Sequence, residues 1–318
     1  MILLTGGTGI VGNSIAHELL RRGRAVRALV RSIERGQAAL PGCELVLGDV
    51  TDAASVDRAM AGCDVVYHAA GLPEQWTNDP TIFERVNVGG TRVVVEAAAR
   101  HGVRRLVYTS TIDVFAMPPG GGAFDEREIA TAPKSTHYQR SKQEADRLVV
   151  ASGVPTVFLH PSAVYGPAPA ASPGLNDFIA DIVAGKVPLL LPGGMPLVFS
   201  SDVAIGHVTA EEQAAPGSRY ILSESYWELA DLARTVRDAA QKGRVPPVMP
   251  RWVAHVIAAG NEAIAGLVGS APLIPRGQLH FLESNSRPSA QRARTELGWR
   301  PLGLREALVP TLVFLAGR

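Results

Sequence analysis

The chain has 318 residues, of which 46% are hydrophobic and 19% are charged, a composition ordinary for a globular enzyme. Its 31 basic and 30 acidic residues leave a net charge of +1, which gives no electrostatic reason to expect a nucleic-acid partner. The two cysteines, Cys43 and Cys63, show neither metal-ligand spacing nor a disulfide framework, so the sequence predicts no metal site and a reducing, cytoplasmic location.

Short β-branched runs alternate with longer helical patterns in the first half of the chain. The predicted strands cover residues 2–4, 25–30, 44–47, 65–68, 106–109 and 156–160. The predicted helices lie at about 13–22, 53–60, 79–100 and 134–152. This alternation is typical of repeated βαβ units, so the sequence predicts an α/β fold with a doubly wound, Rossmann-type parallel sheet.

Prolines and glycines interrupt this alternation in the stretch HPSAVYGPAPAASPG, which begins at His160. Beyond it the pattern is mostly helical, with isolated strand candidates. We therefore expect an NAD(P)-binding Rossmann domain over residues 1–165, to which a segment near 197–224 returns. A smaller, mostly helical substrate-binding domain is expected over residues 166–318.

Glycines cluster directly after the first predicted strand, in TGGTGIVG (residues 5–12). Gly7, Gly9 and Gly12 satisfy the fingerprint G-x-G-x-x-G, whereas Gly6, Gly9 and Gly12 satisfy G-x-x-G-x-x-G. A strand before the loop and a helix after it form the context that dinucleotide binding requires. The glycines allow a tight turn and close backbone approach, and the helix N-terminus offers free N–H groups to a pyrophosphate.

Residues suited to a nucleotide also follow later strands. Asp49 comes at the end of the third strand, where its carboxylate could accept a hydrogen bond from an adenine amino group. Ala69, Ala70 and Gly71 end the fourth strand, and their small size allows a cofactor to approach closely. Because the carboxyl ends of parallel strands share one edge of the sheet, these positions predict a binding edge there.

The second predicted strand, in AVRALVRS, ends in Val30 and Arg31. An NAD-specific site usually places Asp or Glu here to bind the ribose 2′-hydroxyl, and no carboxylate appears before Glu34. A guanidinium instead attracts a 2′-phosphate, which predicts a preference for NADP. Arg35 is near enough in the sequence to assist, and a solvated helix start would explain it equally well. An Arg31 stacked on the adenine would serve both cofactors, so NAD stays as the alternative.

Three hydroxyl residues, Thr109, Ser110 and Thr111, end the fifth predicted strand. On the last helix of the first half, Tyr138 precedes Lys142 by four residues, so both side chains share one face. A lysine ammonium so placed stabilises tyrosinate and lowers the phenol pKa toward the range of a general base. The pair therefore predicts acid–base chemistry, although a surface Tyr–Lys pair would have the same spacing.

Several motifs together resemble an extended short-chain dehydrogenase/reductase. They are TGGTGIVG, GDVTD, HAAG, NVGGT, YTSTIDV and YQRSK, and the later HPSAVYGP and LGWRP extend the resemblance over almost the whole chain. The resemblance reads the glycine loop as Gly6, Gly9 and Gly12. It implies hydride exchange between a nicotinamide and a carbinol or carbonyl carbon of a small-molecule substrate.

The same resemblance assigns roles to individual side chains. Tyr138 is implied as the catalytic acid/base, with Lys142 as its pKa partner and ribose ligand. Thr111 would hold the substrate oxygen, and Asn87 would lie near the active site. The implied cofactor-binding residues are Gly6, Thr8, Gly9, Ile10, Val11, Gly12, Arg31, Asp49, Val50, His68, Ala69, Ala70, Gly71, Tyr138, Lys142, Pro161, Ser162 and Val164.

The family contains ketone reductases, nucleotide-sugar epimerases and nucleotide-sugar dehydratases, and a few positions discriminate among them. Dehydratases typically read S-T-D-E-V, whereas Ile112 here cannot protonate a leaving hydroxyl, and its neighbour Asp113 is expected to be solvated. Nucleotide-sugar members carry an arginine that grips the diphosphate, and Met195 stands in its place. The segments STIDVF and VPLLLPGGMPLVF resemble the dihydroflavonol reductase and 3β-hydroxysteroid dehydrogenase branches.

We therefore expect an oxidoreductase that interconverts a ketone and a secondary alcohol on a small, mostly apolar substrate. A nucleotide-sugar epimerase with the same Tyr–Lys pair is the alternative. A non-catalytic dinucleotide-binding module is disfavoured, because it has no need of Thr111, Tyr138 and Lys142. The resemblance also suggests a homodimer formed through the helices predicted at 79–100 and 134–152.

The longest apolar-leaning stretch covers residues 251–269. Arg251, His255, Asn261 and Glu262 interrupt it, so no integral membrane segment is expected. We interpret the stretch as a packing or lid helix, with a surface-seeking helix near lipid substrates as the alternative.

Several other side chains have no assigned chemistry. His137, His207 and His255 show no metal-ligand spacing and are interpreted as structural. His160 stands where many relatives carry arginine. Trp76 lies in a loop and either lines the mouth of the substrate site or caps a helix start.

Overall fold

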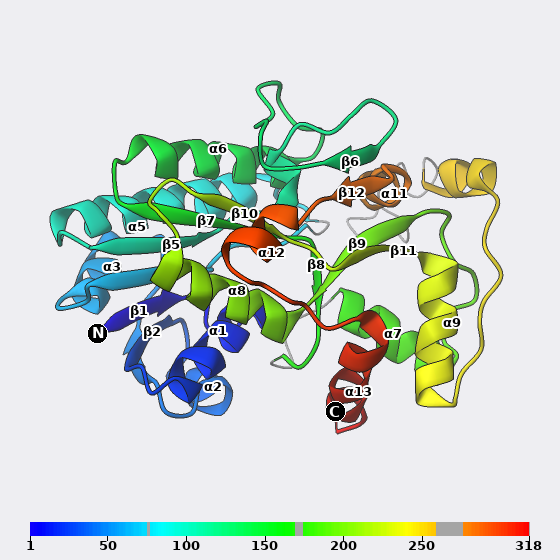
Figure 1. Ribbon diagram of the computed structural model, residues 1–318, viewed down its shortest axis with the longest axis horizontal. Coiled ribbons are helices and arrows are strands. Elements are labelled where there is room, and N and C mark those ends of the chain that lie inside the picture. The colour runs from blue at the N-terminus through cyan, green and yellow to red at the C-terminus, as the bar shows by residue number, and fades with distance from the viewer. Residues whose placement is uncertain (75–76, 169–173, 259–275, 318) are drawn as a thin grey trace.

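A computed structural model of the chain describes residues 1–74, 77–168, 174–258 and 276–317 (Figure 1). At its centre is a seven-stranded sheet in which every neighbouring pair of strands is parallel. In their order across the sheet, the strands are β10 (Arg219–Leu222), β7 (Thr156–Pro161), β5 (Arg105–Thr109), β4 (Val65–His68), β1 (Ile2–Thr5), β2 (Val26–Val30) and β3 (Glu44–Leu47). The six strands predicted in the first half are all present, and the predicted doubly wound, Rossmann-type sheet is confirmed.

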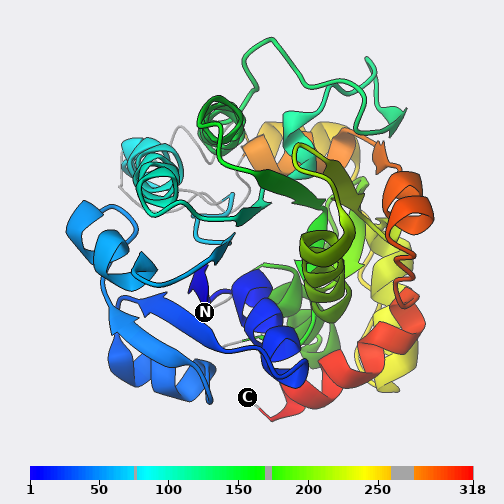
Figure 2. The same ribbon diagram turned by 60° about the vertical axis from the view of Figure 1, so that its left-hand side comes forward.

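Helices cover both faces of this sheet. One face carries α1 (Ile10–Arg21), α2 (Ile33–Ala39) and α8 (Ser200–Gln213), and the other carries α3 (Ala53–Met60), α5 (Gly90–Arg100) and α6 (His137–Ala151). Figure 2 shows the sheet between these layers, with the blue α1 on one side and the green α6 on the other. Successive side chains of β1 point to opposite faces of the sheet, and all of them are apolar or buried. Ile2 and Leu4 pack against the first layer of helices and Leu3 against the second, so the strand contributes to the hydrophobic core on each face.

The predicted helix 79–100 is divided into three parts. They are α4 (Thr81–Phe83), the π-helical turn η1 (Glu84–Gly89) and α5. Single π-helical turns occur often at functional sites, because the extra residue turns one side chain out of the regular helical register. Here the turn carries Asn87, one of the predicted site residues.

The second half of the chain adds two small sheets. In the first, β9 (Gly194–Phe199) lies between β8 (Ala163–Tyr165) and β11 (Ser225–Glu228). In the second, β6 (Gly122–Phe124) pairs with β12 (Ser286–Pro288). The segment near 197–224 was expected to return to the Rossmann domain. Within it, β10 is a strand of the large sheet and α8 packs on one face of that sheet, whereas β9 belongs to the first small sheet.

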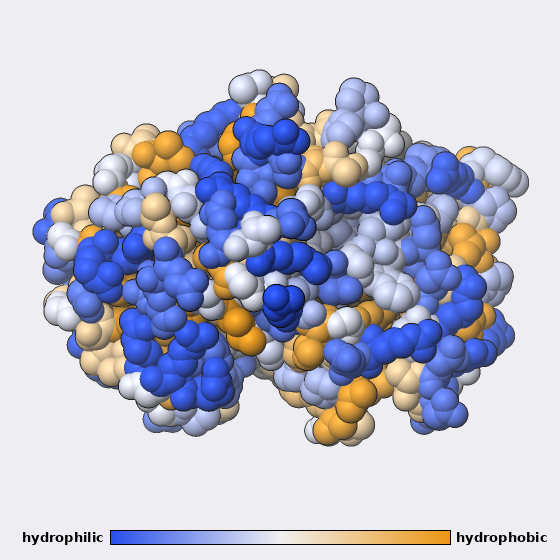
Figure 3. Space-filling model, viewed as in Figure 1, coloured by the Kyte–Doolittle hydropathy of each residue, from blue (hydrophilic) through white to orange (hydrophobic). Residues whose placement is uncertain are grey.

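Helices surround the first small sheet and share an apolar core with it. They are α7 (Leu175–Ala184), α9 (Leu229–Ala240) and α13 (Leu304–Ala316), and α11 (Arg276–Glu283) and α12 (Gln291–Glu296) precede α13 in the chain. Val309 and Val313 on α13 are 62% and 71% exposed, and Figure 3 shows hydrophobic side chains gathered near this helix on a mostly hydrophilic face. The face of α13 that turns away from the core is therefore partly apolar.

The stretch 251–269 is described only in its first half. Residues 251–258 are helical, and Ala254 and Ala258 pack against Leu279 while Trp252 is 72% exposed. The remainder, like Trp76, lies outside the described residues. Within the described ranges, no helix is long and apolar enough to cross a membrane.

Candidate active site

The backbone of the glycine loop requires glycine at positions 6 and 12. Gly6 has a φ of +75°, and a Cβ on it would lie 2.5 Å from the backbone nitrogen of Ala70. A Cβ on Gly12 would lie 2.3 Å from the carbonyl oxygen of Gly6, so helix α1 can pack on the loop only with glycine there. Gly9 differs, because its Cβ would meet only the Gly6 carbonyl oxygen, at 3.4 Å, and the residue is exposed. The bare face of Gly9 therefore leaves room for a phosphate at the N-terminus of α1.

Around this loop lie the residues expected to hold the adenosine half of the cofactor. Thr8, Ile10 and Val11 flank Gly9 and are half-buried. Asp49 follows β3 and is half-buried, and its Oδ1 accepts hydrogen bonds from the backbone nitrogen and the hydroxyl of Thr51 at 2.9 and 2.7 Å. These bonds fix the Asp49 carboxylate beyond the strand end.

Two more of these residues follow the strand ends. Val50 packs on helix α5, where a Cβ on Gly90 would lie 2.9 Å from its Cγ2. Arg31 follows β2 directly and is exposed, and among the described residues no acidic side chain pairs with it. Its guanidinium is therefore available to a ligand.

His68, at the end of β4, is held by the protein itself. Its ring lies between two core hydroxyls, with Nδ1 2.7 Å from Thr5 Oγ1 and Nε2 3.0 Å from Thr91 Oγ1. Burial, with a smaller contribution from Lys142, lowers the pKa of His68 to about 3, so the imidazole is neutral. Both ring nitrogens of His68 are therefore bonded within the core. The small residues at the strand end are the half-buried Ala69 and Ala70, which follow it.

Asn87 joins the loop after β4 to helix α6. Its Oδ1 accepts from the backbone nitrogen of Leu72 at 2.7 Å, and its Nδ2 donates to the Leu72 carbonyl at 3.2 Å and to Ser141 Oγ at 2.9 Å. A Cβ on the exposed Gly71 would lie 3.2 Å from Asn87 Oδ1. The Asn87 side chain is thus fully engaged in positioning its neighbours.

Thr111 and Asp113 form a buried pair just beyond β5, in the short 3₁₀ turn η2 (Ile112–Val114) and its N-cap. Thr111 Oγ1 donates to Asp113 Oδ2 at 2.8 Å, and Gln139 Nε2 donates to Asp113 Oδ1 at 3.0 Å. Asp113 is only 8% exposed, so the expectation of a solvated carboxylate is wrong. The reason is that η2 turns the side chain inward against the first turn of α6, where two donors compensate its burial.

Tyr138 lies in the first turn of α6, and a capping box between Thr136 and Gln139 fixes that turn. Its ring packs edge-on against Phe83, with the ring centroids 6.2 Å apart. Burial raises the pKa of Tyr138 well above its usual value, the Asp113 carboxylate raises it further, and hydrogen bonding with Thr111 opposes both. The phenol is therefore protonated at neutral pH and stands beside Thr111.

Lys142 does not produce the lowered tyrosine pKa expected from its spacing. Its Nζ donates to the carbonyl oxygen of Thr109 at 2.9 Å and lies 5.1 Å from the centroid of the Tyr108 ring. Burial lowers the pKa of Lys142 to about 8, and Asp146 opposes this. The ammonium is directed at the end of β5, so burial and Asp113 control the Tyr138 phenol instead.

A buried ion pair supports the strand ends beneath these side chains. Arg219, on β10, donates to both carboxylate oxygens of Asp146 at 2.7 and 3.0 Å, and Ser110 Oγ donates to the same carboxylate at 2.9 Å. A guanidinium nitrogen of Arg219 also lies 3.3 Å from His160 Nε2. Because arginine can only donate, Nε2 accepts and the ring proton of His160 is on Nδ1. Nδ1 donates it to the Thr111 carbonyl oxygen at 3.1 Å. The sequence analysis missed Arg219 and Asp146, although Tyr138, Lys142 and Asp146 share a four-residue spacing.

The turn between β7 and β8 contains the last predicted cofactor residues. Pro161 ends β7 and is buried, and Val164 in β8 is half-buried. Ser162 is 7% exposed, and its Oγ has no hydrogen-bond partner among the described residues. A buried hydroxyl without a partner costs free energy, which a ligand that bonds it would recover.

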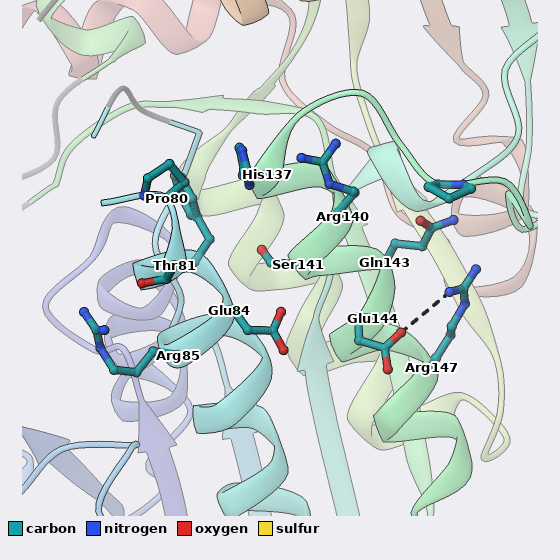
Figure 4. Close-up of a pocket in the computed structure, with 12 residues that line it drawn as sticks. Pro80, Thr81, Glu84, Arg85, His137, Arg140, Ser141, Gln143, Glu144 and Arg147 are labelled. Atoms are coloured by element: carbon teal, nitrogen blue, oxygen red, sulfur yellow. Dashed lines mark ion pairs between the residues drawn. The ribbon is translucent and has the colours of Figure 1, made fainter. Parts of the chain in front are cut away.

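A groove of about 660 Å³ lies between α6 and the segment α4–η1 (Figure 4). Its lining combines apolar residues such as Pro80 and Phe83 with charged ones such as Glu84 and Arg140. An ion pair on the same lining joins Arg147 to Glu144 at 3.6 Å. No predicted catalytic or cofactor-binding side chain lines it. The groove therefore runs along the outer side of α6 and is distinct from the Tyr138 site.

Two of the histidines without assigned chemistry, His207 and His255, have ordinary partners. His207 is fully buried and bonds the Val203 carbonyl and Thr109 Oγ1, and His255 lies 3.0 Å from Glu283. His137 is exposed at the first residue of α6. In the described part of the chain, no group of three His, Cys, Asp or Glu residues is placed to hold a metal ion.

The parallel sheet, the loop of three glycines after β1 and the Tyr–Lys helix beside a hydroxyl-ended strand define an extended short-chain dehydrogenase/reductase. Residues 2–222 match the NAD dependent epimerase/dehydratase family, and the chain belongs to it. It is therefore an enzyme of a family whose members use NAD.

Individual relatives match over nearly their full length. Sterol demethylase protein B of Methylococcus capsulatus is 26% identical over 323 residues, which cover 99% of this chain and 98% of that protein. The 4-hydroxy-2-methyl-3-oxo-4-farnesyl-3,4-dihydroquinoline-1-oxide ketoreductase of Stigmatella aurantiaca is 31% identical over 314 residues, with 93% and 90% covered. The crystal structure of gox2253 superposes with a TM-score of 0.84 and 29% identity, covering 100% of this chain and 98% of the other.

Proposed function

We propose that the chain is an NAD(P)-dependent oxidoreductase that interconverts a ketone and a secondary alcohol on a small, mostly apolar substrate. The observation that carries this proposal is the pairing of the protonated Tyr138 with Thr111 at the carboxyl end of β5. This is the sheet edge at which the glycine loop also lies. A proton donor and an oxygen-binding hydroxyl side by side are what a carbonyl oxygen needs when it is reduced.

The residues present fit a dinucleotide. Gly6, Gly9 and Gly12 form a cradle that larger residues would fill, and Ser162 Oγ is a buried hydroxyl without a protein partner. Arg31 and Asp49 would hold the adenosine half of the cofactor. Bound in this cradle, the cofactor would supply or take up the hydride at its nicotinamide ring.

The chain's own residues then control the proton. Tyr138 donates its phenolic proton to the carbonyl oxygen in reduction and takes it back in oxidation. Thr111 holds the same oxygen, and Lys142, at the end of β5, would hold the ribose of the cofactor. The high pKa of Tyr138 keeps the proton on the phenol until the substrate oxygen acquires negative charge.

An apolar substrate is supported by the segment that precedes and includes β9. Val187, Leu191 and Met195 all pack against the apolar core of the first small sheet. None of these side chains can grip a diphosphate, which the arginine of nucleotide-sugar members does. The names of the sterol and farnesyl-quinoline relatives point to substrates of the same apolar kind.

The experiment that tests the function measures oxidation of NADPH and NADH against a panel of apolar ketones, beside calorimetric titration with UDP and GDP. We expect turnover with at least one ketone and no diphosphate binding apart from the dinucleotide site. Micromolar binding of UDP or GDP at a separate site, without ketone turnover, would favour the nucleotide-sugar epimerase.

We further propose that NADP is preferred over NAD. The Arg31→Ala change should cost NADP about 1.5–3 kcal/mol in kcat/KM, roughly tenfold or more, and leave NAD little changed, because a charged contact to the 2′-phosphate is lost. Steady-state kinetics of wild type and variant with both cofactors provide the comparison. Equal losses would mean that Arg31 stacks on the adenine, and a wild type that favours NAD would contradict the preference outright.

We also propose the homodimer and the cytoplasmic location that the sequence suggests. The groove along α6 and α4–η1 offers a surface of mixed apolar and charged residues on the two helical segments expected to form the dimer (Figure 4). Sedimentation equilibrium that finds only monomer at micromolar concentration would exclude the dimer. The free thiols of Cys43 and Cys63 are compatible with a reducing compartment.

A further inference from the structure

The helix over residues 251–258 turns two large apolar side chains to solvent. Trp252 is 72% exposed, and Val256, one helical turn later, is 64% exposed. The helix itself is held firmly, because Ala254 and Ala258 are buried in an apolar cluster on its other side. Since side chains four residues apart share one face of a helix, Trp252 and Val256 form an apolar ridge that no described residue covers.

Two neighbouring segments extend this apolar ridge. The backbone of Leu190 bonds that of Pro247 at 2.9 Å and that of Met249 at 2.8 Å, which holds the two segments side by side. Next to these bonds, both segments expose an apolar side chain. Large apolar side chains that gather in one place on a protein surface mark a binding site. The apolar face is formed by Leu189, Val248, Trp252 and Val256.

The segments that carry the apolar face contain basic residues and no acidic ones. Residues 182–193 and 242–258 include no Asp or Glu. Their lysines and arginines are Lys186, Lys242, Arg244 and Arg251. All four side chains are exposed, and among the described residues no acidic side chain pairs with any of them. Gly243 packs on the end of α7, where its Cβ would lie 2.5 Å from the Ile182 carbonyl oxygen, so the two basic segments meet.

The acidic side chains that border these segments do not cancel the positive charge. Asp238 pairs with the arginine before it on α9 at 2.5 Å, and Glu283 lies 3.0 Å from His255. Asp181 on α7 and Glu228 at the end of β11 remain, against the four cations. The apolar face is therefore surrounded by a net positive charge, which favours an anionic partner.

We propose that the apolar face docks on the surface of a membrane that contains anionic phospholipids. Tryptophan favours the boundary between headgroups and acyl chains, because its ring is apolar and its N–H is polar. Basic side chains beside it attract the anionic headgroups, and each contributes about fivefold to binding. Figure 1 shows the helix, in gold, at the opposite end of the long axis from the N-terminus, so docking there leaves the large sheet in solution.

The docking surface is continuous with the apolar segment that supports the proposed substrate class. Leu191 packs both against the cluster beneath the helix and against the core of the first small sheet, which Val187 and Met195 also contact. A mostly apolar ketone partitions into a membrane, so docking would bring the enzyme to its substrate. This delivery of substrate rests on the proposed function, whereas the docking itself does not.

Co-sedimentation of the full chain with lipid vesicles tests the docking without substrate or cofactor. One set of vesicles contains phosphatidylcholine and phosphatidylglycerol, and the other contains phosphatidylcholine alone. We expect binding to the anionic vesicles that falls steeply as salt is added, and much weaker binding to the neutral ones. No binding to the anionic vesicles at low salt, or equal binding to both sets, would overturn the proposal.

Single substitutions on the docking surface should weaken vesicle binding without unfolding the protein, because the side chains are exposed. We expect Arg251→Gln to lower the partition coefficient about fivefold and Trp252→Ser about tenfold or more. The matched control is the double change Val309→Ser and Val313→Ser, which removes two equally exposed apolar side chains from α13. It should leave the partition coefficient unchanged, and an equal loss in the control would contradict the assignment of this surface.

A second copy of the chain is the other occupant that the experiment distinguishes. Self-association that Trp252→Ser abolishes, measured by sedimentation equilibrium and found without vesicle binding, would overturn the proposal. The delivery step is tested with a ketone that the enzyme turns over. Trp252→Ser should slow reduction of the ketone held in anionic vesicles and not of the same ketone in solution, and equal rates with both would contradict delivery. If no ketone is turned over, the proposed function fails, and vesicle binding still decides the docking.

Discussion

Replacement of Tyr138 by phenylalanine should lower kcat by about 10²–10⁴-fold, the typical contribution of a positioned general acid or base. The ring would keep its edge-on contact with Phe83, and only the hydroxyl beside Thr111 would be lost. The affinity for the dinucleotide should therefore stay nearly intact. Steady-state kinetics, with cofactor binding measured by fluorescence, provide both numbers.

Lys142→Ala is the informative companion variant, because it should impair both turnover and cofactor affinity. Lys142 Nζ is anchored on the Thr109 carbonyl, at the strand end where the ribose is expected. A Tyr138→Phe enzyme that keeps more than about a tenth of the wild-type rate would remove Tyr138 from the mechanism. A Lys142→Ala enzyme with unchanged cofactor affinity would remove the lysine from the ribose site.

The Arg219→Ala change should lower the free energy of unfolding by about 3–5 kcal/mol, because it leaves a buried carboxylate without its cation. The side chain of Asp146 is 3% exposed, and only Ser110 would remain to bond it. His160 would lose the donor that fixes its tautomer, so the Thr111 backbone would be held less firmly. Urea unfolding of wild type and variant measures the loss in the free energy of unfolding, provided that the m-value is the same for both proteins.

A surface ion pair of the same kind serves as the control. Arg234 and Asp231 on α9 are 2.6 Å apart but 53% and 54% exposed, so Arg234→Ala should cost less than about 0.5 kcal/mol. A loss below about 1 kcal/mol for Arg219→Ala would show that the buried pair is dispensable for stability.

The sequence predicted most of the large sheet because each strand is a short apolar run that the helices bury on both faces. Helix α2 was missed, since its seven residues contain few apolar positions and Ser32 caps it from a loop-like stretch. The division of 79–100 by η1 was also missed. A π-helical turn depends on one inserted residue and leaves the apolar pattern almost unchanged.

The candidate site was predicted where its chemistry is local in the sequence and missed where it depends on packing. The four-residue spacing of Tyr138 and Lys142 on a predicted helix could be recognised directly in the sequence. The burial of Asp113 could not, because it requires η2 to pack against the first turn of α6. Arg219 is 59 residues from His160, and only the parallel pairing of β10 with β7 brings them together.

Transfer of deuterium from a reduced cofactor labelled at the nicotinamide C4 tests the central claim most directly. The enzyme is incubated with labelled NADPH and the ketone that gives turnover, and the product is analysed by mass spectrometry. An alcohol that carries one deuterium at the carbinol carbon, with one equivalent of cofactor oxidised, is the result we predict. Inversion of a nucleotide sugar without net oxidation of cofactor, and no labelled alcohol from any ketone, would contradict the account.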